Sequence, residues 1–423
     1  MIVVVVVADS LRADELGAYG GAAHTPTLDR LAREGALFER AWSCAPWTLP
    51  ALAGLLCGSY GHRVGLIHWK QRWPIAHPTL FDWLAAEGFD VASFVFDPDY
   101  LFTGLGAAGV RGRSGDEQQL LSFVSSWRGS KLLLFVHYWG THVPYVAAPM
   151  SADTWQELTD GVLQTLRRGP ELRAKVRSLY RLAVERFSEQ WLPRLLAALG
   201  AGPGLDDAVV AITADHGESW GERLGPRERI EGVFDLHGNH LFDEALRVPL
   251  LLWAPGACRP GARIAGLVRT VDLAPTLLEL ALGPRAAAAT ADVELDGRSL
   301  ARCLRGQGAP ERCDAFAAGN LSLLELVAEE PFPPRAVDVW DRLALRTERH
   351  AWIWHTATDE RSVYDLERDP AQRAPLTAGS AEIDRGWQRL AEEQARARLG
   401  VIPAELRATE LARAREVAVS LLR

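Results

Sequence analysis

A run of almost pure valine close to the N-terminus constrains the fold of this chain more than any other segment. Ile2–Ala8 contains no polar residue, and residues 208–214 form a second β-branched run. Continuous runs of this kind are typical of strands that are buried on both faces, which occur mainly in parallel sheets covered by helices. We therefore predict an α/β fold with a mainly parallel central sheet.

Polar residues follow both runs at the point where a strand would end. Asp9 follows the first run, and Asp215 and His216 follow the second. Ligands of open α/β sheets bind outside the carboxyl ends of the strands, so these distant residues can meet in one crevice. Two carboxylates and an imidazole suit a divalent cation such as Zn²⁺ or Mn²⁺. Alone, the second motif is equally compatible with a polar turn.

A lone hydroxyl, Thr48, stands just before a short apolar segment that is closed by glycine. Pro50 suits the first turn of a helix and Gly58 a position after its last turn, so Thr48 is expected at the positive end of a helix. The threonine is either a simple helix cap or a nucleophile. In the second case a cation would activate the hydroxyl, which would also be the fourth metal ligand.

The chain resembles the sulfatase branch of the alkaline phosphatase superfamily from residue 2 to about residue 375. The matching motifs occur in family order at 9–20, 25–35, 46–50, 58–65, 142–145, 215–218, 241–250, 271–277, 296–300 and 364–370. The resemblance implies an alkaline-phosphatase-like three-layer sandwich with a small C-terminal α+β subdomain. We expect a catalytic domain over 1–310 and, over 311–423, a subdomain with a small antiparallel sheet and terminal helices.

One departure from the family pattern bears on the chemistry. Sulfatases usually carry Cys-x-Pro-x-Arg, whose cysteine is oxidised to formylglycine, and counting back from Gly58 puts Thr48 in the cysteine place and Leu52 in the arginine place. A rival register that starts at Cys44 breaks the match over residues 55–63. Formylglycine is therefore not expected.

The resemblance then implies phosphoryl rather than sulfuryl chemistry. Superfamily members with threonine in this place are typically phosphodiesterases or phospho-group transferases, which form a phosphothreonine. We expect a metal-dependent enzyme that cleaves or transfers a phosphate ester, a diester or a monoester, through a covalent Thr48 intermediate. Two alternatives stay open: a sulfatase without formylglycine, and a catalytically weak family member that binds an anion.

The same resemblance assigns the site residues. It implies one divalent ion held by Asp9, Thr48, Asp215 and His216, with Zn²⁺ or Mn²⁺ favoured and Ca²⁺ or Mg²⁺ allowed. Ser10 stands where sulfatases often have a second metal-binding aspartate.

Two further histidines, His142 and His237, match family histidines that hold the non-bridging oxygens of the substrate. Donors of that kind stabilise charge that develops on equatorial oxygens. His137 ends an expected buried strand, so we interpret it as a core residue or as one that supports a ligand.

Bulk properties agree with an enzyme that acts on a small anionic ester. The net charge of −8 disfavours nucleic acid as a partner, and no apolar run reaches the ~18 residues that span a bilayer. Five irregularly spaced cysteines do not suggest a disulfide framework, and no signal-like segment precedes the first strand, so we expect a cytoplasmic protein.

The remaining segments predict secondary structure. Residues 152–199 are expected to be helical with a break at 169–170, and 286–290 to be a loop. Short strands are expected at 343–347, 351–356 and 362–364. Two helices over 380–423 would cap the small domain, and they would also allow a homodimer.

Overall fold

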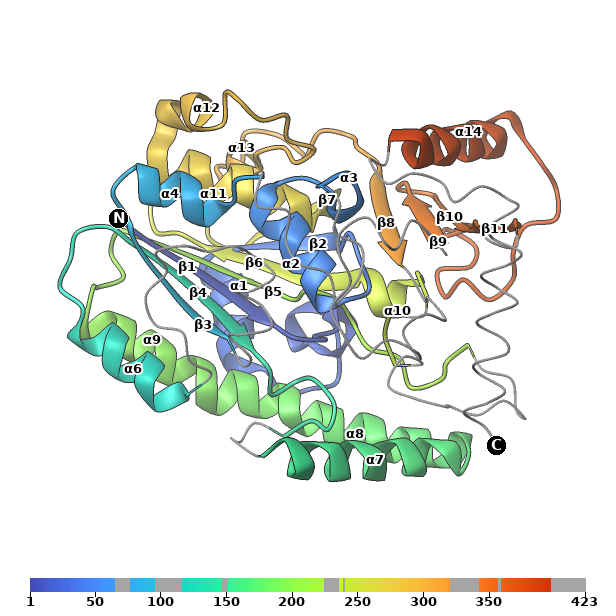
Figure 1. The fold of residues 1–423 in the computed structure, drawn as a ribbon, viewed down its shortest axis with the longest axis horizontal. Coiled ribbons are helices and arrows are strands. Elements are labelled where there is room, and N and C mark those ends of the chain that lie inside the picture. The colour runs from blue at the N-terminus through green and yellow to red at the C-terminus, as the bar shows by residue number, and fades with distance from the viewer. Residues whose placement is uncertain are drawn as a thin grey trace.

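The computed structural model describes residues 1–64, 77–95, 116–146, 151–223, 236–238, 240–319, 342–356 and 359–396. A central sheet lies between two layers of helices, and a smaller sheet stands beside it (Figure 1). The predicted fold class is confirmed.

Seven strands form the central sheet. They are β1 Ile2–Ala8, β2 Ala36–Trp42, β3 Asp90–Val95, β4 Leu132–Tyr138, β5 Ala208–Thr213, β6 Arg247–Trp253 and β7 Ala262–Arg269, in the order β3-β4-β1-β5-β6-β2-β7. β1 pairs in parallel with β4 and β5, and all its residues are buried. β6 runs antiparallel to both of its neighbours. The sheet is thus mainly parallel. Its interior can accommodate the valine run because helices cover both faces of the sheet and keep these side chains buried.

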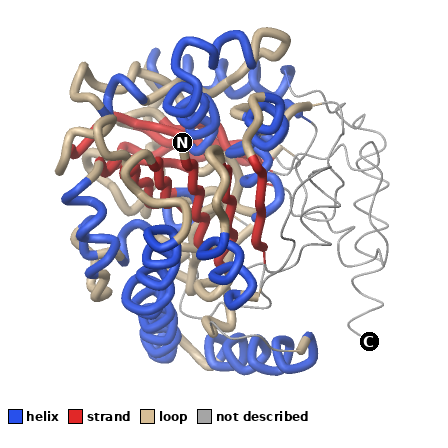
Figure 2. The backbone as a smooth tube through the Cα atoms, turned by 90° about the vertical axis from the view of Figure 1, so that its left-hand side faces the viewer, coloured by secondary structure: helices blue, strands red, loops and turns tan. Residues whose placement is uncertain are grey.

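Helices pack on both faces of this sheet (Figure 2). The described α-helices are α1 Pro26–Glu34, α2 Thr48–Cys57, α3 Gly61–Val64, α4 Leu80–Ala86, α6 Glu117–Ser126, α7 Ala152–Arg167, α8 Pro170–Arg186, α9 Leu192–Ala201, α10 Asp243–Leu246, α11 Leu273–Leu282, α12 Ala286–Ala289, α13 Ala301–Leu304 and α14 Ala381–Arg396. α2, α4 and α11 lie on one side of the sheet, and α6, α8 and α9 lie on the other (Figure 1).

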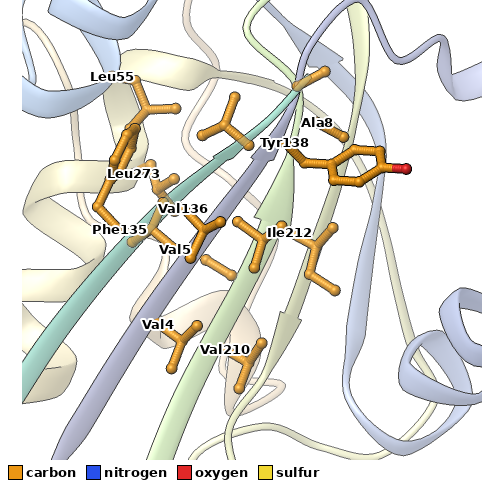
Figure 3. Packing of buried hydrophobic residues seen from close by; sticks show 14 of the residues in the cluster. Val4, Val5, Ala8, Leu55, Phe135, Val136, Tyr138, Val210, Ile212 and Leu273 are labelled. Atoms are coloured by element: carbon orange, nitrogen blue, oxygen red, sulfur yellow. The ribbon is translucent and has the colours of Figure 1, made fainter. Parts of the chain in front are cut away.

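Apolar side chains from the strands and from the covering helices fill the core (Figure 3). Phe135 of β4 and Val5 of β1 point from the sheet into this core near Leu55 of α2 and Leu273 of α11, and all four are buried. Burying a side chain of this size contributes about 1.5–3 kcal/mol. The core therefore fixes α2, whose first residue is Thr48, against the middle of the sheet.

The insertion after β4 is helical, as predicted, and breaks between α7 and α8 at Gly169. A π-helical turn, Phe187–Trp191, joins α8 to α9. The loop predicted at 286–290 is wrong, because the alanines there form α12 and alanine has the highest helix propensity. The expected second C-terminal helix lies outside the described residues.

The smaller sheet is antiparallel. Its strands are β8 Ala315–Gly319, β9 Arg342–Arg346, β10 His350–His355 and β11 Glu360–Asp365, in the order β11-β10-β9-β8. The three predicted strands are confirmed to within two residues. β8 was not predicted, because alanine and glycine have low β-propensity. The sheet begins at Ala315, and the boundary at residue 310 stays a prediction.

No helix among the residues described combines the length and the apolar character that crossing a bilayer requires.

Buried ion pairs join α14 to α3. The carboxylate of Glu393 lies 2.5 Å from Nε2 of His62 and 2.5 Å from a guanidinium nitrogen of Arg63, and only 2% of the residue is exposed. Arg63 also pairs with Asp296. Burial favours the protonated acid, but His62 and Arg63 lower the pKa of Glu393 to about 2. The helix is therefore attached to α3 by charge, while its apolar side chains pack against the smaller sheet.

The first prediction concerns this attachment. Glu393→Gln should destabilise the protein by ~3 kcal/mol, because it removes a buried carboxylate that pairs with Arg63 and contacts His62, and leaves Arg63 with Asp296 alone. The wild type should lose the same contribution as pH falls from about 4.5 to about 2, since the folded-state pKa lies below the ordinary value. Urea unfolding at several pH values measures both effects.

Glu392 provides the matched control for that experiment. Its exposed carboxylate accepts a hydrogen bond from Gln388 at 3.1 Å. Glu392→Gln should change stability by less than ~0.5 kcal/mol. Equal effects of the two substitutions would contradict the assigned role of Glu393.

Candidate active site

Two buried carboxylates meet at the carboxyl edge of the central sheet. Asp9 directly follows β1, and Asp215 lies two residues after β5; their exposed fractions are 0% and 1%. The N–H of Asp9 donates to the carbonyl of Tyr138 at 2.8 Å, which extends the parallel ladder beyond β1. Strand pairing therefore brings together acids that are distant in sequence.

Ser10 orients both carboxylates. Its hydroxyl donates to Oδ1 of Asp9 at 2.8 Å, and its N–H donates to Oδ1 of Asp215 at 3.1 Å. The N–H of His216 donates to the same Oδ1 of Asp215 at 2.9 Å. Ser10 has a positive φ of 59°, which is uncommon for serine and typical of functional sites. These bonds occupy Oδ1 of each acid and leave Oδ2 for other partners.

Thr48 is the first residue of α2 and lies beside this pair. Its Oγ1 is 3.4 Å from Oδ2 of Asp9 and 3.4 Å from Nε2 of His216. Nε2 of His216 is 3.6 Å from Oδ2 of Asp215. Two donors that are each about 2.1 Å from a tetrahedral ion lie about 3.4 Å apart. The four residues that we predicted as ligands thus lie close together, at spacings that fit one divalent ion.

Cys44, the start of the rival register, lies elsewhere. Its sulfur is buried 3.8 Å from the carbonyl oxygen of Pro50, and a Cβ built at Gly54 would collide with it. Burial raises the pKa of the thiol to about 11. Among the described residues this sulfur makes no contact with either aspartate, whereas the hydroxyl of Thr48 does contact Asp9.

His237 is held by a carboxyl group. Its Nδ1 lies 2.9 Å from Oε1 of Glu218, and the hydroxyl of Tyr145 donates to Oε2 of Glu218 at 3.2 Å. Burial raises the pKa of Glu218 to about 8, while burial and the charge of His216 lower the pKa of His237 to about 3. At neutral pH the protonated Glu218 therefore donates to Nδ1, and His237 carries its own proton on Nε2.

His142 has the opposite arrangement. Its Nδ1 donates to the carbonyl of Val143 at 2.6 Å, and burial lowers its pKa. The neutral ring then has an unprotonated Nε2. The ring stacks on Trp139, with centroids 4.0 Å apart, and its centroid is 5.1 Å from that of His237. The two histidines that we expected to act alike therefore differ in where their proton sits.

Two residues of the site, His137 and Glu218, were not predicted from the sequence as catalytic groups or metal ligands. His137 of β4 lies with Nε2 3.3 Å from Oδ2 of Asp9 and 3.5 Å from Oδ2 of Asp215. It is buried, as expected, but its donor atom and those of the two acids fall within 4.8 Å of one another. The sequence feature that could have identified His137 is its position at the end of a strand next to β1. For Glu218 the corresponding feature is its position in the motif that follows β5.

Aromatic side chains near the site make different contacts. Trp47 makes an edge contact with His237 at a centroid distance of 5.7 Å. His240 contacts Phe242 at a centroid distance of 5.8 Å, and within the described ranges it makes no contact with Asp9 or Asp215.

The mainly parallel α/β sheet thus carries a buried cluster of Asp9, Asp215, His216 and Thr48 at its carboxyl edge, with donor atoms that could hold a divalent ion. The family model described as "Sulfatase" matches residues 2–284, and a second, "N-sulphoglucosamine sulphohydrolase, C-terminal", matches residues 231–393. The chain belongs to the sulfatase family of hydrolases, whose members bind a divalent metal ion.

Curated relatives match part of the chain. The steryl-sulfatase of Mus musculus is 30% identical over 202 residues, which cover 44% of this chain and 31% of that protein. The iduronate 2-sulfatase of Mus musculus is 28% identical over 229 residues, which cover 45% and 39%. The matched region thus spans only 31% and 39% of the length of these two relatives.

Solved structures share the fold over nearly the whole chain. The phosphonate monoester hydrolase of Agrobacterium radiobacter has a TM-score of 0.68 at 18% identity, covering 93% of this chain and 95% of that one. A protein solved with its substrate D-glucosamine-2-N,6-O-disulfate has a TM-score of 0.68 at 17% identity, covering 93% and 97%. One scaffold therefore carries hydrolases of different esters.

The second prediction follows from the raised pKa of Glu218. In metal-free protein, stability should fall as pH rises from about 4.5 to about 8, because the folded state binds the carboxyl proton more tightly than the unfolded state. Glu218→Gln should remove this loss, so its melting temperature should exceed that of the wild type at pH 8 and match it near pH 5.

Glu222→Gln is the control for this prediction. Although burial favours its acid form, Arg12 lowers the pKa of Glu222, so the substitution should destabilise at neutral pH. Glu218→Gln melting below the wild type at pH 8 would contradict a protonated Glu218.

Proposed function

We propose that this protein hydrolyses a phosphate ester, either a diester or a monoester, with Thr48 as the nucleophile. The observation that carries the proposal is the place of Thr48 Oγ1, which lies 3.4 Å from both Asp9 and His216 at the N-terminal end of α2. Partial positive charge at that end of a helix favours an anionic ester. The neighbouring cysteine is buried behind the helix, so it is not a candidate for the modified residue that sulfatases use.

In the first step, Oγ1 of Thr48 attacks phosphorus, the ester P–O bond breaks, and the leaving alcohol takes up a proton. A bound divalent cation would favour the ionised hydroxyl and offset the charge of the phosphoryl group. His237 donates its Nε2 proton to a non-bridging oxygen in a hydrogen bond. Glu218 and Tyr145 fix the orientation of that ring.

In the second step, water attacks phosphorus and the bond to Oγ1 of Thr48 breaks, which releases phosphate from a monoester substrate or a phosphate monoester from a diester. We assign to His142 the role of taking the proton of this water, because its Nε2 is unprotonated; that proton then returns to Oγ1 of Thr48. Stacking against Trp139 holds its ring in one orientation. An acceptor alcohol in place of water would make the protein a transferase.

Sulfate ester hydrolysis is the second candidate, and the curated relatives favour it because both are sulfatases. Two features count against it for this chain. Thr48 stands in the place of the modified cysteine, and Leu52 stands in the place of the motif's arginine. A plain threonine sulfate would have to be released by direct attack of water, without collapse of an aldehyde hydrate.

The third prediction tests the nucleophile. Thr48→Ala should lower turnover of an aryl phosphate monoester or diester on the order of 10³–10⁶-fold, since it removes both a nucleophile and a metal ligand. Turnover is measured after chelation and readdition of Zn²⁺, Mn²⁺, Mg²⁺ or Ca²⁺, with aryl sulfate in parallel. Acid quenching of the wild type during turnover should yield phosphothreonine at position 48.

Cys44→Ala is the matched control, because it removes a buried sulfur next to the same helix without touching Thr48. It should retain most of the activity. Cleavage of aryl sulfate alone would favour the sulfatase, and loss of activity in Cys44→Ala with retention in Thr48→Ala would refute the assigned nucleophile.

A further inference from the structure

His137 is a buried histidine without a hydrogen-bond partner. Its side chain is fully buried, and neither ring nitrogen makes a hydrogen bond among the described residues. Its Nε2 lies 3.3 Å from Oδ2 of Asp9 and 3.5 Å from Oδ2 of Asp215, which is close enough for attraction but is not aligned for hydrogen bonds. Oδ2 of Asp215 also lacks a hydrogen-bond partner there.

A buried donor or acceptor without a hydrogen-bond partner destabilises the folded protein by about 1–3 kcal/mol. Three atoms, one from each of His137, Asp9 and Asp215, converge here from three adjacent strand ends. Their separations of 3.3 and 3.5 Å match the ~3.4 Å between two ligands of a tetrahedral ion. A cation bound by all three would satisfy them.

The bonds made by Ser10 limit which oxygens are free for that cation. Oδ1 of Asp9 accepts the Ser10 hydroxyl, and Oδ1 of Asp215 accepts the N–H groups of Ser10 and His216. Each acid therefore offers one free oxygen, its Oδ2. Ser10 uses its hydroxyl to orient a ligand, as hydrogen-bond donors around metal sites commonly do.

We propose that His137 is a metal ligand of this protein, and that its imidazole stands in for the carboxylate missing at position 10. With Asp9, Asp215, Thr48 and His216, it gives the ion two nitrogen donors and three oxygen donors. This inference extends the single-metal site that the proposed function requires, and it makes the site select a transition-metal ion over Ca²⁺.

The selectivity follows from ligand chemistry. Ca²⁺ takes six to eight oxygen ligands, often with carboxylates bound through both oxygens. Each acid of this site has one oxygen that is not bonded to Ser10, and the site also has two imidazoles, which suit Zn²⁺ and related ions.

The fourth prediction is tested by metal binding without any substrate. Metal-stripped wild-type protein and His137→Asn are titrated with Zn²⁺, Mn²⁺ and Ca²⁺, with the bound metal measured by elemental analysis. His137→Asn should lose more than ~100-fold in Zn²⁺ affinity, beyond the ~10–100-fold typical of a residue that only supports a ligand. The wild type should bind Zn²⁺ far more tightly than Ca²⁺.

Spectroscopy of substituted ions counts the nitrogen ligands directly. Electron paramagnetic resonance of the Cu²⁺ form should report two imidazole nitrogens in the wild type and one in His137→Asn. An unchanged nitrogen count in His137→Asn, or unchanged Zn²⁺ affinity, would overturn the proposal. These readouts need no turnover, so they can succeed or fail independently of the proposed function.

Two further variants guard against misfolding and test the substitution of ligands. His240→Asn removes a half-buried histidine whose ring nitrogens are buried and lack hydrogen-bond partners among the described residues, and it should leave Zn²⁺ binding unchanged. Ser10→Asp combined with His137→Asn replaces one imidazole of the site with a carboxylate. This double variant should shift the metal preference of the site toward Ca²⁺. Continued preference for Zn²⁺ in a folded double variant, judged by circular dichroism, would overturn the inferred selectivity.

Discussion

The forced proximity of two buried carboxylates shapes the rest of this structure. Parallel pairing of β1 with β5 sets the residues after each strand side by side, and both acids point into a dry interior. Like charges repel strongly in a medium of low dielectric constant, so the surrounding groups have to offset them. Hydrogen-bond donors of Ser10, the imidazoles of His137 and His216, and the positive end of α2 all gather around this pair. The groups that surround the two carboxylates therefore offset the negative charge of the pair.

The sequence was informative wherever chemistry follows directly from strand order. Asp9 and Asp215 were predictable because a buried strand must end, and polar residues at that end face a ligand. His137 was harder to assign, since its position opposite Val7 depends on the register between β4 and β1, which only tertiary packing decides. The strand at 315–319 was missed for a related reason, because packing overrides the low β-propensity of alanine and glycine. The helix at 286–289, by contrast, follows the high helix propensity of alanine, which the loop prediction neglected.

His142 and His237 show what a motif cannot specify. Both belong to family motifs, yet one ring contacts a backbone carbonyl and the other contacts a carboxyl group. Those partners decide which nitrogen carries the proton, and therefore whether the ring gives or accepts a hydrogen bond. The scaffold is shared with hydrolases of sulfate and phosphonate esters, so the choice of ester depends on a few such local contacts rather than on the fold.

The long-range contacts of this protein join residues that are synthesised at different times. β1 is synthesised well before its partners β4 and β5, and His62 before the residue 331 positions further on that it contacts. Proteins dominated by such distant pairings fold slowly. Asp9 and Thr48 are likewise synthesised well before Asp215. These three residues can therefore come together only after β5 has been made and has paired with β1.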